Sequence, residues 1–87
     1  MSRTGMHAAK LENSPRLQRI VAFLRLRGAT GATGAELFRE CGVLNPGTYA
    51  SEINRQAQEF RIVCRYDGTA ESGARVYRYT LIEGVVS

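Results

Sequence analysis

Apolar residues recur at helical spacing near the start of the chain, between Ser14 and Gly28. The apolar positions of this stretch are Leu17, Ile20, Val21 and Leu24. They fall at i, i+3, i+4 and i+7, so a helix would gather them on one face. Ser14 can cap the first turn, the proline that follows it suits the first helical position, and Gly28 can end the helix. We therefore expect an amphipathic helix here.

A second and shorter helical pattern covers about residues 34–41. Thr33 and Glu36 have the spacing of a capping box, in which each side chain accepts from the other residue's backbone N–H. The apolar positions that follow are Leu37, Phe38 and Cys41. Gly42 is expected to end this helix, and Val43 follows as an apolar residue that can plug the core.

The third helical pattern runs from about residue 46 to residue 58 and is mostly polar. Asn45 and Pro46 repeat the arrangement of a capping residue followed by proline. A thin apolar stripe at i, i+3 and i+7 consists of Ala50, Ile53 and Ala57. Small alanines on this stripe would let the helix lie close to its neighbours, while its polar side chains would lie at or near the surface.

After Phe60 the period changes from helical to alternating, which indicates strands. Residues 61–66 and 75–81 are rich in β-branched and aromatic side chains, and a loop that opens at Asp67 and Gly68 would join them as a hairpin. We expect every second residue to face the helices: Ile62, Cys64 and Tyr66 on the first strand, and Tyr77, Tyr79 and Leu81 on the second. This core role for the tyrosines is preferred over a stacking platform for single-stranded nucleic acid.

The chain has 87 residues, of which 44% are hydrophobic. This length favours a single domain, and this composition argues against disorder throughout. The predicted fold class is α+β, with a three-helix bundle followed by a C-terminal two-stranded β-hairpin. We expect a flexible leader at 1–13, the folded domain at 14–82 and a tail at 83–87. The leader is read as a frayed terminus, or else as a basic arm on a phosphate backbone that uses Arg3, His7 and Lys10.

The formal net charge is +4, and eleven of the twelve cations are arginine. The planar guanidinium matches phosphate groups and guanine edges, whereas the ammonium of lysine acts more as a point charge. An excess of this size is also common in proteins without a polyanionic partner. The charge alone therefore leaves nucleic-acid binding open without establishing it.

Residue types needed for catalysis or metal binding are sparse. Cys41 and Cys64 lie far apart and His7 is the single histidine, so the ligands of a zinc site are missing. The sequence has no carboxylates spaced for metal binding or acid–base catalysis, and no glycine-rich phosphate loop follows a predicted strand. Nothing in it therefore indicates an enzyme. We expect no enzymatic activity, no metal, no cofactor and no small-molecule substrate. Because no segment has the apolar length of a signal peptide or a membrane span, we expect a cytoplasmic protein without a membrane partner.

Three helices, a tight turn between the second and third, and then a hairpin form the element order of a winged helix-turn-helix domain. The sequence also resembles small bacterial and prophage winged helix-turn-helix proteins. This resemblance covers about residues 14–82 and rests on the segments 33–37, 42–46, 50–55, 62–65 and 77–81. It implies binding to double-stranded DNA and a role in transcription or phage regulation. In such domains the third helix enters the major groove and the hairpin lies against the backbone or the minor groove.

Nine residues form the predicted DNA-contacting set: Asn45, Thr48, Tyr49, Ser51, Glu52, Arg55, Arg65, Arg75 and Arg78. Arg55 would reach a guanine edge or a phosphate, and Thr48 and Ser51 lie near the helix end that approaches bases. Tyr49 either packs inward or contacts a thymine methyl or a phosphate. Glu52 would repel phosphates unless it accepts from a cytosine. The hairpin arginines would hold phosphates, or would only keep an exposed sheet soluble.

The sequence thus favours a sequence-specific DNA-binding protein, a small transcriptional regulator that reads the major groove with the helix at 46–58. A winged-helix domain that binds protein instead is the first alternative. The acidic residues that suit it are Glu36, Glu40, Glu52 and Glu59. The second alternative is an architectural or recombination accessory factor that bends DNA. One module covers a small site, so a homodimer or a protein partner would add specificity.

Overall fold

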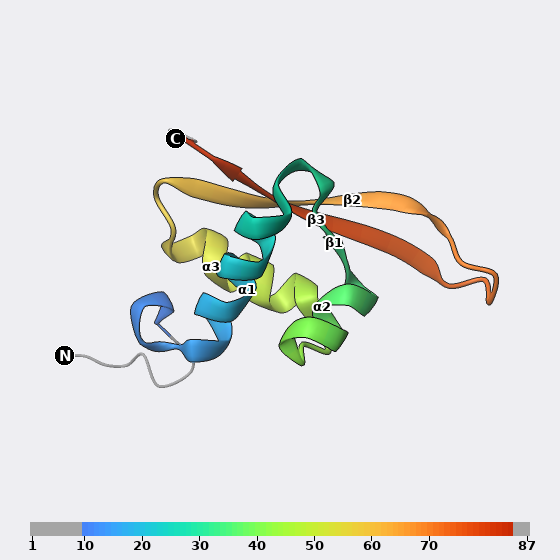
Figure 1. Ribbon diagram of the computed structural model, residues 1–87, viewed down its shortest axis with the longest axis horizontal. Coiled ribbons are helices and arrows are strands. Elements are labelled where there is room, and N and C mark those ends of the chain that lie inside the picture. Colours follow the sequence, from blue (N-terminus) through green and yellow to red (C-terminus); the bar gives the residue numbers. More distant parts are fainter. Residues whose placement is uncertain (1–9, 85–87) are drawn as a thin grey trace.

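Three α-helices cover one face of a three-stranded antiparallel sheet in the computed structural model, which describes residues 10–84 (Figure 1). The fold class is therefore α+β. The elements, in chain order, are the 3-10 turn η2 (Leu11–Asn13), helix α1 (Pro15–Arg27), the 3-10 turn η3 (Gly28–Thr30), strand β1 (Ala32–Thr33), helices α2 (Gly34–Cys41) and α3 (Pro46–Gln56), and strands β2 (Phe60–Thr69) and β3 (Arg75–Glu83).

Helix α1 has the caps and the buried stripe that its sequence predicts. The Ser14 hydroxyl accepts a hydrogen bond from the Leu17 N–H at 3.2 Å, and Pro15 takes the first helical position. The buried residues of the helix are Leu17, Ile20, Val21 and Leu24. Gly28 ends the helix with a φ of 58°, a value that favours glycine. The prediction for this segment is confirmed.

Helix α2 begins with the predicted capping box. The Glu36 N–H donates to the Thr33 hydroxyl at 3.2 Å, and the Thr33 N–H donates to Glu36 Oε1 at 2.9 Å. The hydrogen bond from the Thr33 backbone lowers the pKa of Glu36, and the Arg27 guanidinium at 3.2 Å lowers it further. Gly42 ends the helix in the left-handed conformation, and Val43 is buried directly after it. The turn into α3 is thereby anchored in the core.

A short strand that the sequence does not predict, β1, adds a third strand to the hairpin. Ala32 and Thr33 pair antiparallel with Tyr79 and Arg78 of β3, so the strand order is β1-β3-β2. Gly31 makes this approach possible. Its φ is 65°, and a Cβ at this position would lie 2.5 Å from the Tyr79 carbonyl oxygen.

The hairpin of β2 and β3 is longer than predicted, and its turn lies elsewhere. The predicted turn at Asp67 and Gly68 is wrong, because both residues belong to β2. A shift in strand register absorbs them as a bulge. The chain reverses instead at residues 70–74, across a backbone hydrogen bond of 2.8 Å. The hairpin therefore projects beyond the helices, and we call its projecting part, residues 66–77, the arm (Figure 1).

The hydrophobic core lies between the helices and the inner face of the sheet, the face that carries Ile62, Tyr79 and Leu81. Cys64 and Tyr66 follow Ile62 in the alternation, but the prediction that they are buried is wrong, since both are exposed. Tyr77 is also exposed, at 39% against 7% for Tyr79. The reason is that the helices cover only the proximal part of the inner face. The alternation continues onto the arm, where Tyr66 and Tyr77 are far more exposed than Tyr79.

The described ends of the chain contact the folded part. Leu11–Asn13, predicted to belong to the leader, form the turn η2, whose Leu11 N–H donates to Gln56 Oε1 of α3 at 2.6 Å. Glu83, predicted to begin the tail, belongs to β3 and forms an ion pair with Arg25 at 2.7 Å. The leader at 1–9, with Arg3 and His7, and the tail at 85–87 lie outside the described residues. Between residues 10 and 84, no helix has the length and apolar character needed to cross a membrane.

Candidate nucleic-acid interface

Helix α3 presents a polar row on the side away from the core. Ala50 and Ile53 are buried beneath the helix, as predicted. On the opposite side, Thr48, Ser51 and Arg55 are all exposed. Their spacing of i, i+3 and i+7 places them in one line along the helix, and we call these three residues the outer row. The core makes no use of this row, so its side chains are available to a ligand.

The C-terminal part of α3 is tied to the sheet by Asn54. The Asn54 carboxamide nitrogen donates to the Ile62 carbonyl at 2.8 Å, and its oxygen accepts from the Ile62 N–H at 2.7 Å. The helix ends at Gln56 rather than at the predicted residue 58, because Ala57 is extended, with a ψ of 140°, and leads the chain toward β2. These contacts fix the orientation of α3 against the edge strand of the sheet.

The flank of α3 that faces α1 is held as well. Arg16 Nη1 donates to the Tyr49 hydroxyl at 3.2 Å, and its guanidinium lies 5.9 Å from the centre of the Tyr49 ring. Further along this flank, Gln56 Nε2 donates to Glu52 Oε2 at 2.8 Å, and Gln56 Oε1 accepts from Leu11. Tyr49 is therefore partly buried against its neighbours. With both flanks held, the outer row has a fixed direction.

The N-terminal end of α3 adjoins the inner face of the sheet. The predicted side-chain cap by Asn45 is wrong: its carbonyl accepts from the Thr48 N–H at 3.1 Å, but its side chain makes no capping hydrogen bond and is exposed. The Asn45 carboxamide is therefore available to a ligand. A Cβ at Gly47 would lie 3.7 Å from the Tyr79 hydroxyl, so this helix end is next to the point where the arm begins.

The charge of α3 is balanced within the helix. Arg55 Nη2 donates to Glu52 Oε1, so the carboxylate that would repel a phosphate is neutralised by its neighbour. The Arg55 side chain stays 68% exposed, whereas that of Glu52 is 17% exposed. No described residue accepts from Arg55 Nε or Nη1. The arginine can therefore keep its intrahelical ion pair and still donate to a second partner.

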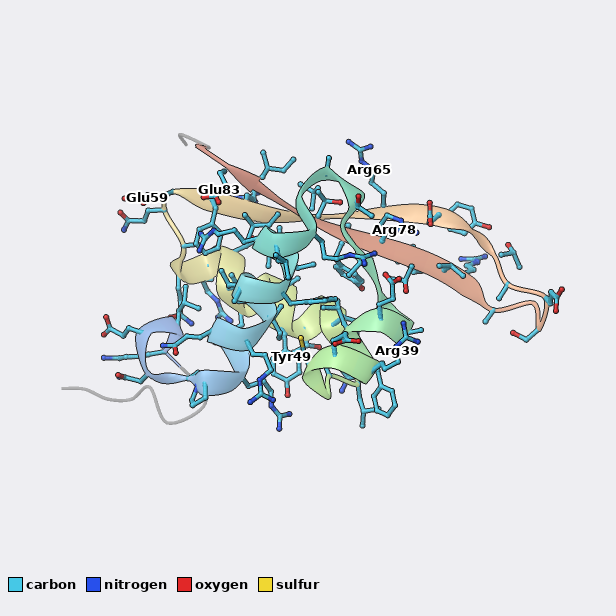
Figure 2. All side chains as sticks on the ribbon, viewed as in Figure 1. Arg39, Tyr49, Glu59, Arg65, Arg78 and Glu83 are labelled. Carbon is cyan, nitrogen blue, oxygen red and sulfur yellow. The ribbon has the colours of Figure 1, made fainter. Side chains whose placement is uncertain are left out.

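The three predicted hairpin arginines do not form one patch. Arg65 and Arg78 are direct cross-strand partners on β2 and β3 (Figure 2). Strand alternation places both on the outer face, opposite to that of Tyr79. Arg78 is held by Asp67 at 3.0 Å and by the Thr30 carbonyl at 2.9 Å. Arg75 lies on the inner face of the arm instead. Neither Arg65 nor Arg75 has an ion pair with any described carboxylate.

Sequence reasoning missed one feature of this surface and set a second one aside. Arg16 of α1 reaches Tyr49, and its signal in the sequence is only an arginine on the polar side of the first helix. On the arm, Tyr66 and Tyr77 surround a shallow hollow of about 310 Å³ together with Arg75. Alternation assigns these tyrosines to the same face as the core, and it contains no signal that the helices stop short of them.

The buried titratable groups lack the properties of catalytic ones. Burial raises the pKa of Tyr79 to about 12, and a hydrogen bond with the Cys64 thiol adds to the shift. Burial also raises the pKa of the Cys41 thiol. Both groups are protonated near neutral pH and are thus poor nucleophiles. In the part of the chain that the structure describes, no three side chains of the metal-binding types gather into a site.

Comparison of the chain with protein-family models, with curated proteins and with solved structures found no match.

Proposed function

We propose that the chain is a winged helix-turn-helix protein that binds double-stranded DNA sequence-specifically, with α3 in the major groove and the arm as its wing. The observation that carries this proposal is the outer row. Thr48, Ser51 and Arg55 are small or forked polar side chains, exposed in one line on a helix whose flanks are fixed. A helix that reads base edges needs this combination, because hydrogen bonds to bases require donors and acceptors at set positions.

Each residue of this surface has a role in the proposed complex. Arg55 donates to a guanine edge or to a phosphate while Glu52 keeps its guanidinium oriented. Ser51 and Thr48 offer hydroxyls to base edges, and Asn45 is placed at the helix end for an adenine or a phosphate. Arg65, which has no described ion-pair partner, supplies a contact to the backbone that does not depend on sequence.

The biological role that follows is that of a small regulator of bacterial or phage origin that acts by occupying its site. One module of this size covers few base pairs, so a homodimer or a protein partner completes the specificity.

Selection of bound sequences from random duplex DNA tests the proposal, with mobility shifts at about 50 mM and about 200 mM salt. The wild-type chain should bind more weakly at the higher salt and should select a defined sequence. Arg55→Ala should lose about tenfold in affinity and relax the selected sequence at one position. Arg61→Ala, which changes an exposed arginine of the outer sheet face, is the matched control and should leave the selected sequence unchanged.

A protein-binding role is the second candidate, because two large apolar residues are exposed in α2 and in the turn that follows it. Phe38 of α2 is 54% exposed, and Leu44 in the turn before α3 is 76% exposed. Apolar side chains in such positions are typical of protein contacts. Absence of binding to any duplex at low salt would refute the DNA proposal and favour this second function.

A further inference from the structure

We infer that the inner face of the arm is a second nucleic-acid contact, in which Tyr66, Tyr77 and Arg75 hold an unstacked base of a distorted or single-stranded DNA segment. This inference rests on the proposed function and adds a preference for DNA structure to the reading of sequence by α3. We call these three residues the arm cluster.

The first observation is the exposure of two aromatic rings that the fold does not need as core. Tyr66 is 58% exposed and Tyr77 is 39% exposed. They are direct cross-strand partners, and their ring centres lie 5.9 Å apart at an interplanar angle of 65°. In this edge-to-face arrangement the two rings support each other and still leave aromatic surface in solvent. Exposed aromatic rings on a ribbon are the groups on which nucleobases stack.

The second observation is that the pair of aromatic rings is held in place. The Tyr66 hydroxyl is 2.6 Å from the Thr69 hydroxyl, a hydrogen bond that spans the bulge of β2. The rings and Arg75 line a shallow, open hollow of about 310 Å³. A rigid aromatic platform loses little side-chain entropy when a ligand binds to it.

The third observation concerns charge. Arg75 has no ion pair with any carboxylate among residues 10–84. Asp67, the acidic residue of β2, is engaged by Arg78 at 3.0 Å. The cluster thus combines an uncompensated guanidinium with aromatic rings and contains no aliphatic side chain. This chemistry matches a nucleotide, whose base stacks and whose phosphate takes the cation, rather than an apolar peptide segment.

The fourth observation is continuity with the proposed reading helix. The N-terminal end of α3 lies beside the Tyr79 hydroxyl, and Tyr77 is two residues further along the same face of β3. Two residues of a strand span about 7 Å, and successive base pairs of duplex DNA are about 3.4 Å apart. A base two or three steps beyond those that face α3 would therefore reach the arm cluster if it left the stack.

The test uses the full chain with the duplex selected above, in three forms: intact, with one unpaired nucleotide placed two or three steps from the site, and with a single-stranded extension there. The unpaired position carries 2-aminopurine, whose fluorescence falls when an aromatic ring stacks on it. Wild-type protein should bind the two altered forms about tenfold more tightly than the intact duplex and should quench the probe.

Variants of the arm cluster separate the contribution of the arm to DNA binding from that of α3. The double variant Tyr66→Leu, Tyr77→Leu keeps apolar cross-strand contact. It should select the same sequence on intact duplex, because α3 is unchanged, while losing the preference for the altered forms and the quenching. The matched variant Tyr66→Phe, Tyr77→Phe keeps both rings and should therefore retain the preference for the altered forms and the quenching. Arg75→Gln should lower the affinity for the extended form and should reduce its dependence on salt.

The outcomes distinguish the two proposals. If the wild-type chain binds duplex but has equal affinity for all three DNA forms, the arm contact is overturned. The proposed reading of sequence by α3 is unaffected by that result. A preference that survives in the leucine variant overturns the arm contact as well. In a third outcome, the wild-type chain does not bind duplex but quenches a single-stranded probe, and the leucine variant does not quench it. That result overturns the proposed function and retains the arm cluster as a base-binding site.

Discussion

Two tyrosines two residues apart on one strand show how differently the two halves of the hairpin are used. Tyr79 and Tyr77 lie on the same face of β3, and both follow the same alternation. Tyr79 is 7% exposed beneath the helices, whereas Tyr77 is 39% exposed on the arm. The proximal half of the hairpin therefore contributes to stability, and the distal half is free to contact other molecules. The strand is the same in both halves, so the difference in exposure arises because the helices cover only the proximal half of the hairpin.

The largest expected effect is on the proximal half. Tyr79→Ala removes a buried aromatic side chain and should lower the free energy of unfolding by about 3–5 kcal/mol. The matched Tyr77→Ala removes an exposed ring and should cost about 1 kcal/mol or less. Urea unfolding followed by circular dichroism measures both values. Equal losses would mean that the arm is packed in solution and would contradict the division.

A smaller loss is expected where β1 joins the proximal half. In Gly31→Ala, the new Cβ would lie 2.5 Å from the Tyr79 carbonyl oxygen, in a backbone conformation that side chains disfavour. We expect a loss of about 2–3 kcal/mol, because backbone cannot move aside as a flexible side chain can. Gly73→Ala, at the arm's turn, is the control: its φ is 93° but nothing lies within 4 Å of its Cβ position. Thermal unfolding that ranks Gly73→Ala as the more damaging change would refute this account.

Asn54→Ala tests the link between the proximal half and α3. The change removes two hydrogen bonds to Ile62 and should cost about 2 kcal/mol of stability. Because it also releases α3 from the sheet, DNA binding should weaken even in conditions where the protein is fully folded. Ser51→Ala removes a side chain of the outer row and should affect DNA binding without changing stability. Calorimetric unfolding measures the stability of both variants, and mobility shifts measure their affinity for DNA.

The effect that is smallest near neutral pH is a dependence on alkaline pH. Burial raises the pKa of Tyr79 to about 12, above the ordinary value of about 10 for an unfolded chain. The folded state therefore holds this proton more tightly, so its stabilising contribution is complete below about pH 10 and is lost as the pH rises toward 12, at about 1.4 kcal/mol per pH unit. Tyr79→Phe should flatten this part of the profile, and Tyr77→Phe should not.

The parts of the fold that the sequence predicts are those set by neighbouring residues. The capping box of Thr33 and Glu36 forms within four residues, and each glycine that ends a helix acts on its own turn. The cap expected at Asn45 fails although its sequence signal resembles that of Ser14. The outer row of α3 could be predicted because it is the complement of the buried stripe.

The remaining features depend on residues far apart in the chain. Strand β1 has two residues and exists only because β3, more than forty residues later, pairs with it. The bulge at Asp67 and Gly68 occupies a sequence that usually turns, and the partner strand decides between the two outcomes. The exposure of Tyr66 depends on where the helices end in space. No local pattern in the sequence encodes these facts.

The two hydrogen bonds of Asn54 have a consequence for the assembly of the protein. A carboxamide offers the same donor and acceptor as a peptide group, so at Ile62 it occupies the place of a neighbouring strand. It thereby blocks sheet extension at the proximal end of β2. The free backbone edge of this strand begins beyond it, near Cys64, and there the bulge and the exposed Arg65 discourage the flat edge-to-edge pairing that starts aggregation. One helix side chain thus protects the sheet from unwanted growth.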